Sequence, residues 1–147
     1  MNKLFIYFSW TGNGEFLTSE LKGYEPHKVE MKKPLKKMNF FRIFRYGFLA
    51  GTQKKVPIKE MDLNLSQDDQ VVIGSPIWND RLCNPILTLL SKYDFNKETT
   101  QFVLYSGGGK ADHAKVQLEK LGFKKEPIIL KQPLQNEEAT KDALKNL

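Results

Sequence analysis

The sequence has 147 residues, of which 40% are hydrophobic and 27% are charged, and its formal net charge is +6. These values indicate one soluble globular domain over residues 1–147 and exclude a largely disordered chain, which would contain fewer apolar and aromatic residues. The apolar runs are far shorter than the ~20 residues of a membrane span, and the N-terminus lacks the cleavage site of a secretory signal. The single cysteine excludes an internal disulfide, so we expect a cytoplasmic protein.

Short hydrophobic runs predict five strands along the chain. Their expected ranges are Lys3–Phe8, His27–Met31, Gln70–Gly74, Gln101–Ser106 and Pro127–Lys131. The first, third and fourth runs are continuously apolar rather than alternating. Continuous runs are typical of strands that are covered on both faces in a parallel sheet.

Helical patterns follow these strands. Their expected ranges are Gly14–Lys22, Met38–Leu49, Pro85–Lys92, Lys110–Leu121 and Asn136–Leu147. Gly122 is well placed to end the fourth helix, and Asn136 to cap the fifth. The alternation of strand and helix predicts an α/β fold, a doubly wound parallel sheet of five strands with right-handed crossovers.

Ligands of such sheets bind beyond the carboxyl ends of the strands, so the loops that leave three of the strands are considered together. These loops contain Ser9, Trp10, Thr11, Gly12, Asn13 and Gly14, then Ser75, Pro76, Ile77, Trp78 and Asn79, and then Ser106, Gly107, Gly108 and Gly109. Because parallel strands end on the same side, we expect all three loops to open on one edge of the sheet.

The first loop has the composition of a phosphate-binding turn. Ser9 and Thr11 alternate along the chain, so both hydroxyls can donate to one phosphate, while Gly12 and Gly14 allow the backbone to approach closely. The N-terminus of the following helix favours an anion. Residues 9–21 contain no Lys or Arg, so the predicted site uses neutral donors. The alternative is an ordinary strand-to-helix turn capped by Thr11 or Asn13.

The other two loops suit a flat heteroaromatic ligand. Trp78 lies among turn residues near the expected edge, where its ring could stack on a ligand or could instead cover the core. The run Gly107–Gly109 exposes backbone donors and acceptors that could bond the polar rim of a ring, although it could also be a flexible turn.

Other phosphate and catalytic motifs match poorly. A Walker loop is absent, and the dinucleotide motif has only its first half, because Leu17 stands at the position of the third glycine. Glu30 does lie at about the spacing of a ribose-binding acid, so a dinucleotide enzyme remains an alternative.

The remaining reactive side chains form no evident site in the sequence. His27 and His113 lack partners at metal-ligand spacing, and Cys83 lacks the basic residue of a thiolate phosphatase. Asp68 and Asp69 precede the third strand, at the end opposite the predicted site, and we expect a solvated turn there.

Together, the segments "YFSWTGNG", "VVIGSPIWN" and "VLYSGGG" resemble the flavodoxin-like family. The resemblance implies FMN as the cofactor and a sheet with strand order 2-1-3-4-5. It places the FMN phosphate on Ser9–Gly14, where Gly14 stands at a position that is usually Thr in the family. It places the flavin against Trp78, with the pyrimidine side at Ser106–Gly109, and Trp10 is a candidate second wall.

The function implied by this resemblance is electron transfer or a small flavin-dependent reductase activity, in which the flavin does the chemistry. We expect a redox partner protein or a small electron acceptor, with no nucleic-acid partner and no transmembrane segment. The alternative is a binding module of the same fold that holds no flavin. Such a module would use its basic segment, residues 28–59, on an acidic partner, an anionic membrane or nucleic acid.

The basic segment also bears on redox potential. Its only acid is Glu30, and its basic residues are Lys28, Lys32, Lys33, Lys36, Lys37, Arg42, Arg45, Lys54, Lys55 and Lys59. Positive charge near the ring would stabilise an anionic reduced flavin and raise its midpoint potential, and would favour an acidic partner or an anionic substrate.

Overall fold

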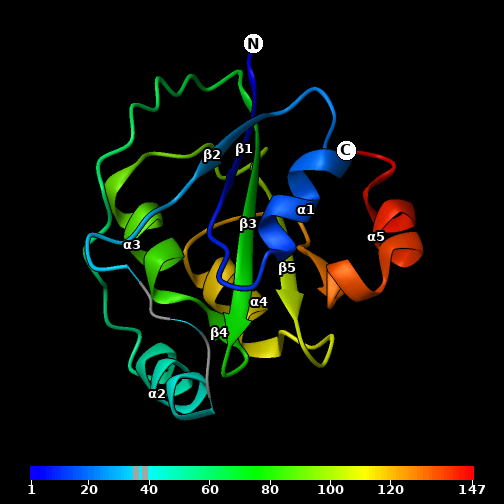
Figure 1. Ribbon diagram of the computed structural model, residues 1–147. Coiled ribbons are helices and arrows are strands. Elements are labelled where there is room, and N and C mark those ends of the chain that lie inside the picture. The colour runs from blue at the N-terminus through cyan, green and yellow to red at the C-terminus, as the bar shows by residue number, and fades with distance from the viewer. Residues whose placement is uncertain (35–36, 38–39) are drawn as a thin grey trace.

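The computed structural model describes residues 1–34, 37 and 40–147 (Figure 1). Its elements are β1 Lys3–Tyr7, α1 Asn13–Glu20, β2 Glu25–Lys28, α2 Phe40–Gly51, β3 Gln70–Trp78, β4 Arg81–Leu82, α3 Asn84–Lys92, β5 Gln101–Ser106, α4 Asp112–Lys120, β6 Ile128–Lys131, η1 Pro133–Gln135 and α5 Glu137–Leu144. Within these described ranges, no helix is long and apolar enough to cross a bilayer.

The central sheet has the order β2-β1-β3-β5-β6, and neighbouring strands along this path are parallel. The short strand β4 lies off the path and pairs antiparallel with β3. With β4 set aside, this is the order 2-1-3-4-5, so the predicted α/β class and strand order are confirmed.

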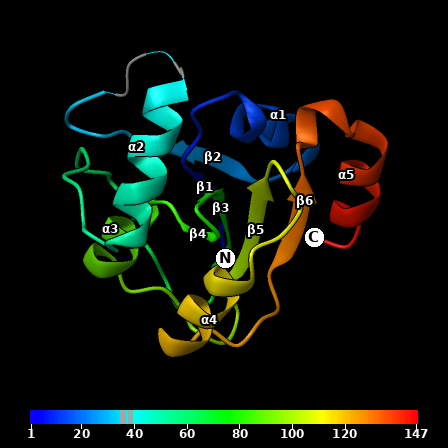
Figure 2. The same ribbon diagram turned by 90° about the horizontal axis from the view of Figure 1, so that it is seen from below.

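Helices cover both faces of the sheet, which explains the continuous apolar strands (Figure 2). Successive residues of β1 point to opposite faces, so Ile6 enters one core and Phe5 the other. The first core lies against α3 and α4 and includes Ile6, Ile73, Phe102, Ile86, Leu89 and Leu118. The second lies against α1 and α5 and includes Phe5, Tyr7, Val103, Leu17, Leu21 and Leu144.

The third strand differs most from its prediction. The prediction ends it at Gly74, but Ser75 and Pro76 also pair with β5, and β3 continues to Trp78 because its last two residues pair with β4. The expectation that residues 75–79 form a loop is therefore wrong for all but the last of them. The chain reverses at Asn79 and Asp80, whose φ angles are 50° and 60°, as a two-residue hairpin turn requires, and it returns as β4.

Two other elements need comment, while the bounds of the remaining ones differ from their predictions by at most three residues at either end. The second strand spans Glu25–Lys28 rather than His27–Met31, because its parallel partners are Leu4–Tyr7. The helix expected at Met38–Leu49 is α2, which extends to Gly51; Met38 lies outside the described residues.

The hairpin turn between β3 and β4 is attached to the start of α4. The Asp80 carbonyl accepts the N–H of Ala114 at 2.9 Å, and one Asp80 carboxylate oxygen accepts the N–H of His113 at 3.3 Å. The same oxygen lies 2.6 Å from His113 Nδ1. Although burial raises the pKa of Asp80, these contacts with His113 outweigh it and lower the pKa below its usual value.

Asp69 is a structural residue, and its predicted place in a solvated turn is wrong. Its side chain is only 3% exposed. One carboxylate oxygen accepts the N–H of Asn2 at 2.8 Å, and the other accepts the N–H of Ser66 at 2.9 Å. These hydrogen bonds lower the pKa of Asp69 and join the N-terminus to the segment that leads into β3.

Asp69→Asn is expected to lower the melting temperature at neutral pH, since an amide nitrogen cannot accept the second N–H. A lowered folded-state pKa stabilises the fold above the unfolded value of about 3.9, and this contribution is lost as pH falls through the folded value. The difference in melting temperature should therefore shrink in acid. The control is Asp68→Asn, at an exposed neighbour. A difference that is independent of pH would contradict this account.

Candidate ligand-binding site

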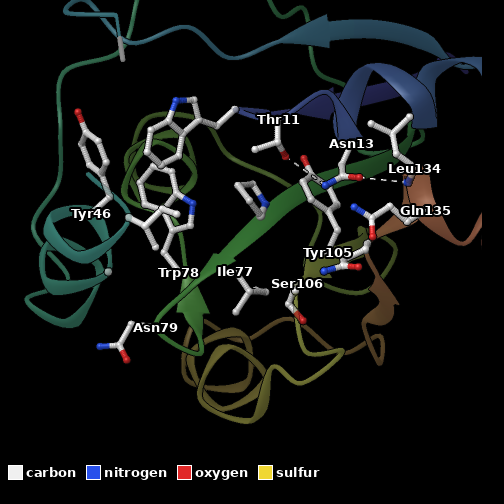
Figure 3. Close-up of a pocket in the computed structure, with 16 residues that line it drawn as sticks. Thr11, Asn13, Tyr46, Ile77, Trp78, Asn79, Tyr105, Ser106, Leu134 and Gln135 are labelled. Atoms are coloured by element: carbon white, nitrogen blue, oxygen red, sulfur yellow. Dashed lines mark hydrogen bonds between the residues drawn. The ribbon is translucent and has the colours of Figure 1, made fainter. Parts of the chain in front are cut away.

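A cavity of about 550 Å³ lies at the carboxyl edge of the sheet (Figure 3). It is lined by Trp10, Thr11, Asn13, Ile43, Tyr46, Gly47, Pro76, Ile77, Trp78, Asn79, Tyr105, Ser106, Gly107, Gln132, Leu134 and Gln135. The volume lies within the roughly 300–1,000 Å³ of small-molecule sites. These lining residues include no Asp, Glu, Lys or Arg, so the cavity has neutral walls.

The three sequence-predicted loops do meet around this cavity, but not with all their residues. Those that line it are Trp10, Thr11, Asn13, Pro76, Ile77, Trp78, Asn79, Ser106 and Gly107. Those that lie outside its lining are Ser9, Gly12, Gly14, Ser75, Gly108 and Gly109. Of this second group, Ser9, Gly14 and Gly109 form hydrogen bonds within the loops, and Gly12 and Gly109 have positive φ angles.

Ser9 holds the first loop from within. Its hydroxyl oxygen accepts the N–H of Gly14 at 3.0 Å in a buried position. Burial tends to raise the pKa of Glu15, but hydrogen bonds from Lys28 and Ser9 lower it below its usual value. The Lys28 ammonium lies 2.5 Å from that carboxylate. The Ser9 hydroxyl therefore has both an acceptor and a donor partner within the protein.

Gly14 is required by the space around it. A Cβ atom at this position would lie 2.5 Å from a ring carbon of Tyr7 and 2.7 Å from the Ser9 Cβ. Contacts below 3.0 Å are essentially never seen for a real Cβ, so something would have to move. The buried Tyr7 ring thus fills the position that a threonine side chain would need.

Thr11 and Asn13 connect the first loop to the segment after β6. The Asn13 amide nitrogen donates to the Thr11 hydroxyl oxygen at 3.2 Å, and the Asn13 amide oxygen accepts the N–H of Leu134 at 3.2 Å (Figure 3). Gly12, between them, has a φ of +89°, a left-handed value that favours glycine. Because the Thr11 oxygen accepts this bond, its own proton can be donated to a ligand.

Three aromatic side chains from different parts of the chain meet in the cavity. The Trp10 ring lies 4.9 Å from that of Tyr46 and 5.9 Å from that of Trp78, and Tyr46 lies 5.5 Å from Trp78. Trp78 also contacts the core edge-on, with its centroid 5.8 Å from that of Phe8. Trp78 therefore contacts one aromatic ring of the core and two that line the cavity.

The third loop curls around Ser106. The Ser106 hydroxyl oxygen accepts the N–H of Gly109 at 2.7 Å and the N–H of Lys110 at 3.1 Å. This turn leaves Gly107 at the cavity and takes Gly108 and Gly109 away from its lining. The preceding residue, Tyr105, donates its hydroxyl to the Phe8 carbonyl, and burial raises its pKa well above the ordinary value. Its phenol therefore remains a neutral donor.

Seven lining residues are not among those predicted from the sequence: Ile43, Tyr46, Gly47, Tyr105, Gln132, Leu134 and Gln135. The segment that contains Gln132 and Gln135 follows β6 and so belongs to a fourth loop at the same edge. The rule used for the other loops would have found it. For Tyr46 on α2 the sequence contains no comparable signal.

Other reactive side chains lie outside the cavity lining. Cys83 is fully buried, and burial raises its pKa to about 12, so its thiol stays protonated. Ser75 is also buried, with its oxygen 3.4 Å from the N–H of Cys83, which places it in the core. Within the described ranges, no group of three His, Cys, Asp or Glu side chains is placed to hold a metal ion.

Comparison with known proteins supports the fold assignment. No family model matches the sequence, and no curated protein matches it significantly. A flavoprotein from Lactobacillus acidophilus NCFM, solved in complex with FMN, is 21% identical with a TM-score of 0.60, over 82% of this chain and 85% of that chain.

Two similar structures come from Bacteroides. A protein of Bacteroides eggerthii DSM 20697 that is assigned as a flavoprotein is 22% identical with a TM-score of 0.73, over 99% of this chain and 96% of that one. One from Bacteroides uniformis ATCC 8492, with the same assignment, is 19% identical with a TM-score of 0.73, over 98% and 97%. The sheet order and these similarities together identify the flavodoxin-like fold.

Proposed function

We propose that this protein binds FMN in the cavity and acts in electron transfer or as a small flavin-dependent reductase. The observation that carries the proposal is the pairing, in one neutral cavity, of a Thr11 turn with an aromatic cluster around Trp78. A protein that shares the fold, from Lactobacillus acidophilus, was solved with FMN. The expected cytoplasmic location and the expected redox partner or small electron acceptor belong to this proposal.

The residues present fit the chemical parts of FMN. Thr11 supplies a hydroxyl donor at the start of α1, where the helix dipole favours an anion. Trp78 and Trp10 supply flat rings for stacking. Gln132 and Gln135 add amides that can bond the polar rim of a ring, together with the backbone of Gly107.

FMN supplies the hydride or electron chemistry when bound, and the chain supplies binding and orientation. Trp10, Tyr46 and Trp78 pack against one another and exclude water from their side of the cavity. Asn13 fixes the Thr11 hydroxyl, and Ser106 fixes the Gly107 backbone through the turn that it caps.

The test is a titration of the purified protein with FMN and with riboflavin, followed by visible absorption and flavin fluorescence. Micromolar or tighter binding of FMN, with weaker binding of riboflavin, would support both the ring site and the phosphate turn. No binding of either would refute the proposal. A thermal-shift preference for NAD over FMN would instead revive the dinucleotide alternative. Oxidation of NADH or NADPH by the FMN-loaded protein distinguishes a reductase from a carrier.

Thr11→Ala is expected to weaken FMN binding about tenfold, because a hydrogen bond to a charged group is lost. Riboflavin binding should change little, since riboflavin has no phosphate. Thr11→Ser should retain most of the affinity. Thr18→Ala, on the helix α1 that follows the loop and outside the cavity lining, is the matched control. Equal losses for FMN and riboflavin would show that Thr11 does not act on the phosphate.

The midpoint potential of bound FMN should exceed that of acidic flavodoxins and should fall as salt is added. Arg42, Arg45 and Lys54 do not line the cavity, so their influence on an anionic reduced flavin would act over a longer range and would be screened by salt. Spectroelectrochemical titration at low and high salt measures this effect. A low potential that salt does not change would contradict it. Lys36, in the same basic segment, lies outside the described residues.

A further inference from the structure

The outer side of α2 carries a ridge of three phenylalanines. Phe41, Phe44 and Phe48 are 83%, 75% and 73% exposed. Their spacing of three and four residues places them on one side of the helix. A cluster of exposed aromatic rings on a small domain typically marks an interaction surface, since isolated exposed apolar residues need no such explanation.

The segment of the chain that contains this phenylalanine ridge is strongly basic. Residues 31–59 contain no Asp or Glu. Exposed cations of this segment are Lys32, Lys33, Lys37, Arg45, Lys54 and Lys55. The acids at its two ends have cationic partners already, as Glu30 lies 3.1 Å from Lys59 and Glu60 lies 2.6 Å from Lys92. The positive charge of this segment is therefore not cancelled by these two acids.

We propose that the ridge docks on the surface of an anionic lipid bilayer. Phe44 and Phe48 would enter the boundary between headgroups and acyl chains, and the surrounding cations would lie among the headgroups. A helix with an aromatic side and flanking Lys and Arg is typical of proteins that lie on membranes. Basic side chains near an anionic leaflet are attracted to its negative surface potential, so the exposed cations of this segment add an attraction that salt would screen.

Charge and composition favour lipid over the other possible occupants. Two copies of this chain that met ridge to ridge would bring like charges together, because a two-fold interface pairs the same patch on both subunits. Protein interfaces are depleted in Lys, whereas five of the six exposed cations here are Lys. Anionic lipid headgroups do not discriminate against Lys in this way, because their attraction for a protein depends on its net positive charge.

Docking in this way would bring the cavity close to the lipid. The opposite side of α2 contributes Ile43, Tyr46 and Gly47 to the cavity lining, so only the ~10 Å thickness of one helix separates ridge and cavity. Figure 1 shows α2 at the end of the molecule to which β3 points. The two tryptophans of the chain, Trp10 and Trp78, both line this cavity and can report the approach.

The experiment is co-sedimentation with vesicles of phosphatidylcholine alone and of phosphatidylcholine mixed with phosphatidylserine. We expect binding to the mixed vesicles only, decreasing with added salt. Phe44→Ser with Phe48→Ser should reduce the affinity at least tenfold. Val116→Ser with Leu121→Ser, at exposed apolar positions outside α2, is the matched control and should leave it unchanged. Melting temperatures verify that each variant folds.

Tryptophan energy transfer to a dansyl-labelled lipid supplies a second readout, and it should rise on binding to mixed vesicles. Absence of binding to these vesicles, equal binding to both kinds, or full binding by the phenylalanine variant would each overturn the proposal. Binding to polyglutamate but not to vesicles, lost in the same variant, would assign the ridge to an acidic protein instead. These assays need no flavin, so their result is independent of the proposed function.

Discussion

Trp78→Ala is expected to weaken FMN binding by about 1–3 kcal/mol, the loss typical of an aromatic stacking platform. Its ring lies in the cavity beside Trp10 and Tyr46, so truncation would remove one flat wall and admit water. Since each 1.4 kcal/mol is a factor of ten, the dissociation constant should rise several-fold to more than a hundredfold. Fluorescence titration with FMN measures the change.

Stability must be measured alongside this affinity, because Trp78 also packs against Phe8. Trp78→Phe should retain much of the binding, since it keeps a ring. Tyr24→Ala removes a partly buried aromatic ring that does not line the cavity, so it should cost stability and leave FMN affinity unchanged. If Trp78→Ala lowered the melting temperature but bound FMN normally, Trp78 would be a core residue alone.

Gly14→Thr is expected to destabilise the protein by about 1–3 kcal/mol, the usual cost of forcing extra volume into a packed site. The overlap begins at the Cβ atom, which would meet Tyr7 and Ser9. Gly14→Ala should therefore show much of the loss already. At this chain length, each kcal/mol corresponds to about 2–4 °C in melting temperature. Chemical denaturation gives the free energy of unfolding directly.

The FMN affinity of the Gly14→Thr variant distinguishes two reasons for a glycine at this position, a missing hydroxyl donor and a lack of space. If the glycine were only a missing hydroxyl donor, Gly14→Thr would leave stability intact and tighten FMN binding. On steric grounds we expect lower stability and weaker FMN binding. Tyr7 and Ser9 must shift to admit the side chain, and the loop shifts with them. Gly108→Ala, where an added Cβ meets nothing within 4 Å, is the matched control and should be nearly neutral.

Local sequence patterns were sufficient to predict most of the sheet, but not the whole of β3. The apolar runs of β1 and β5 are bounded by polar residues, so the ends of β5 could be predicted, and those of β1 to within one residue. Ser75 and Pro76 suggest a turn, yet they pair with Leu104 and Tyr105 of a strand that follows much later in the sequence. Such pairing is a tertiary effect that local propensity does not contain.

The residues that line the cavity also fall into two groups: those that the local sequence predicts and those that only tertiary packing brings there. The places of Thr11 and Trp78 at the cavity could be predicted because Thr11 follows the end of β1 and Trp78 is the last residue of β3, at the edge where ligands bind. Tyr46 lies on a crossover helix whose position over the edge depends on packing against β3 and β4. Gln132 directly follows β6, so the same rule applies to it as to the residues of the other loops at this edge.

The attachment of the β3–β4 turn to α4 has a consequence for folding. The N–H groups of His113 and Ala114, at the start of α4, bond to Asp80, more than thirty residues earlier in the chain. A helix of nine residues is marginal by itself in water, so α4 should gain its order only when the turn is already formed. Amide exchange should then show the hairpin tip and the first turn of α4 opening together, as one cooperative unit.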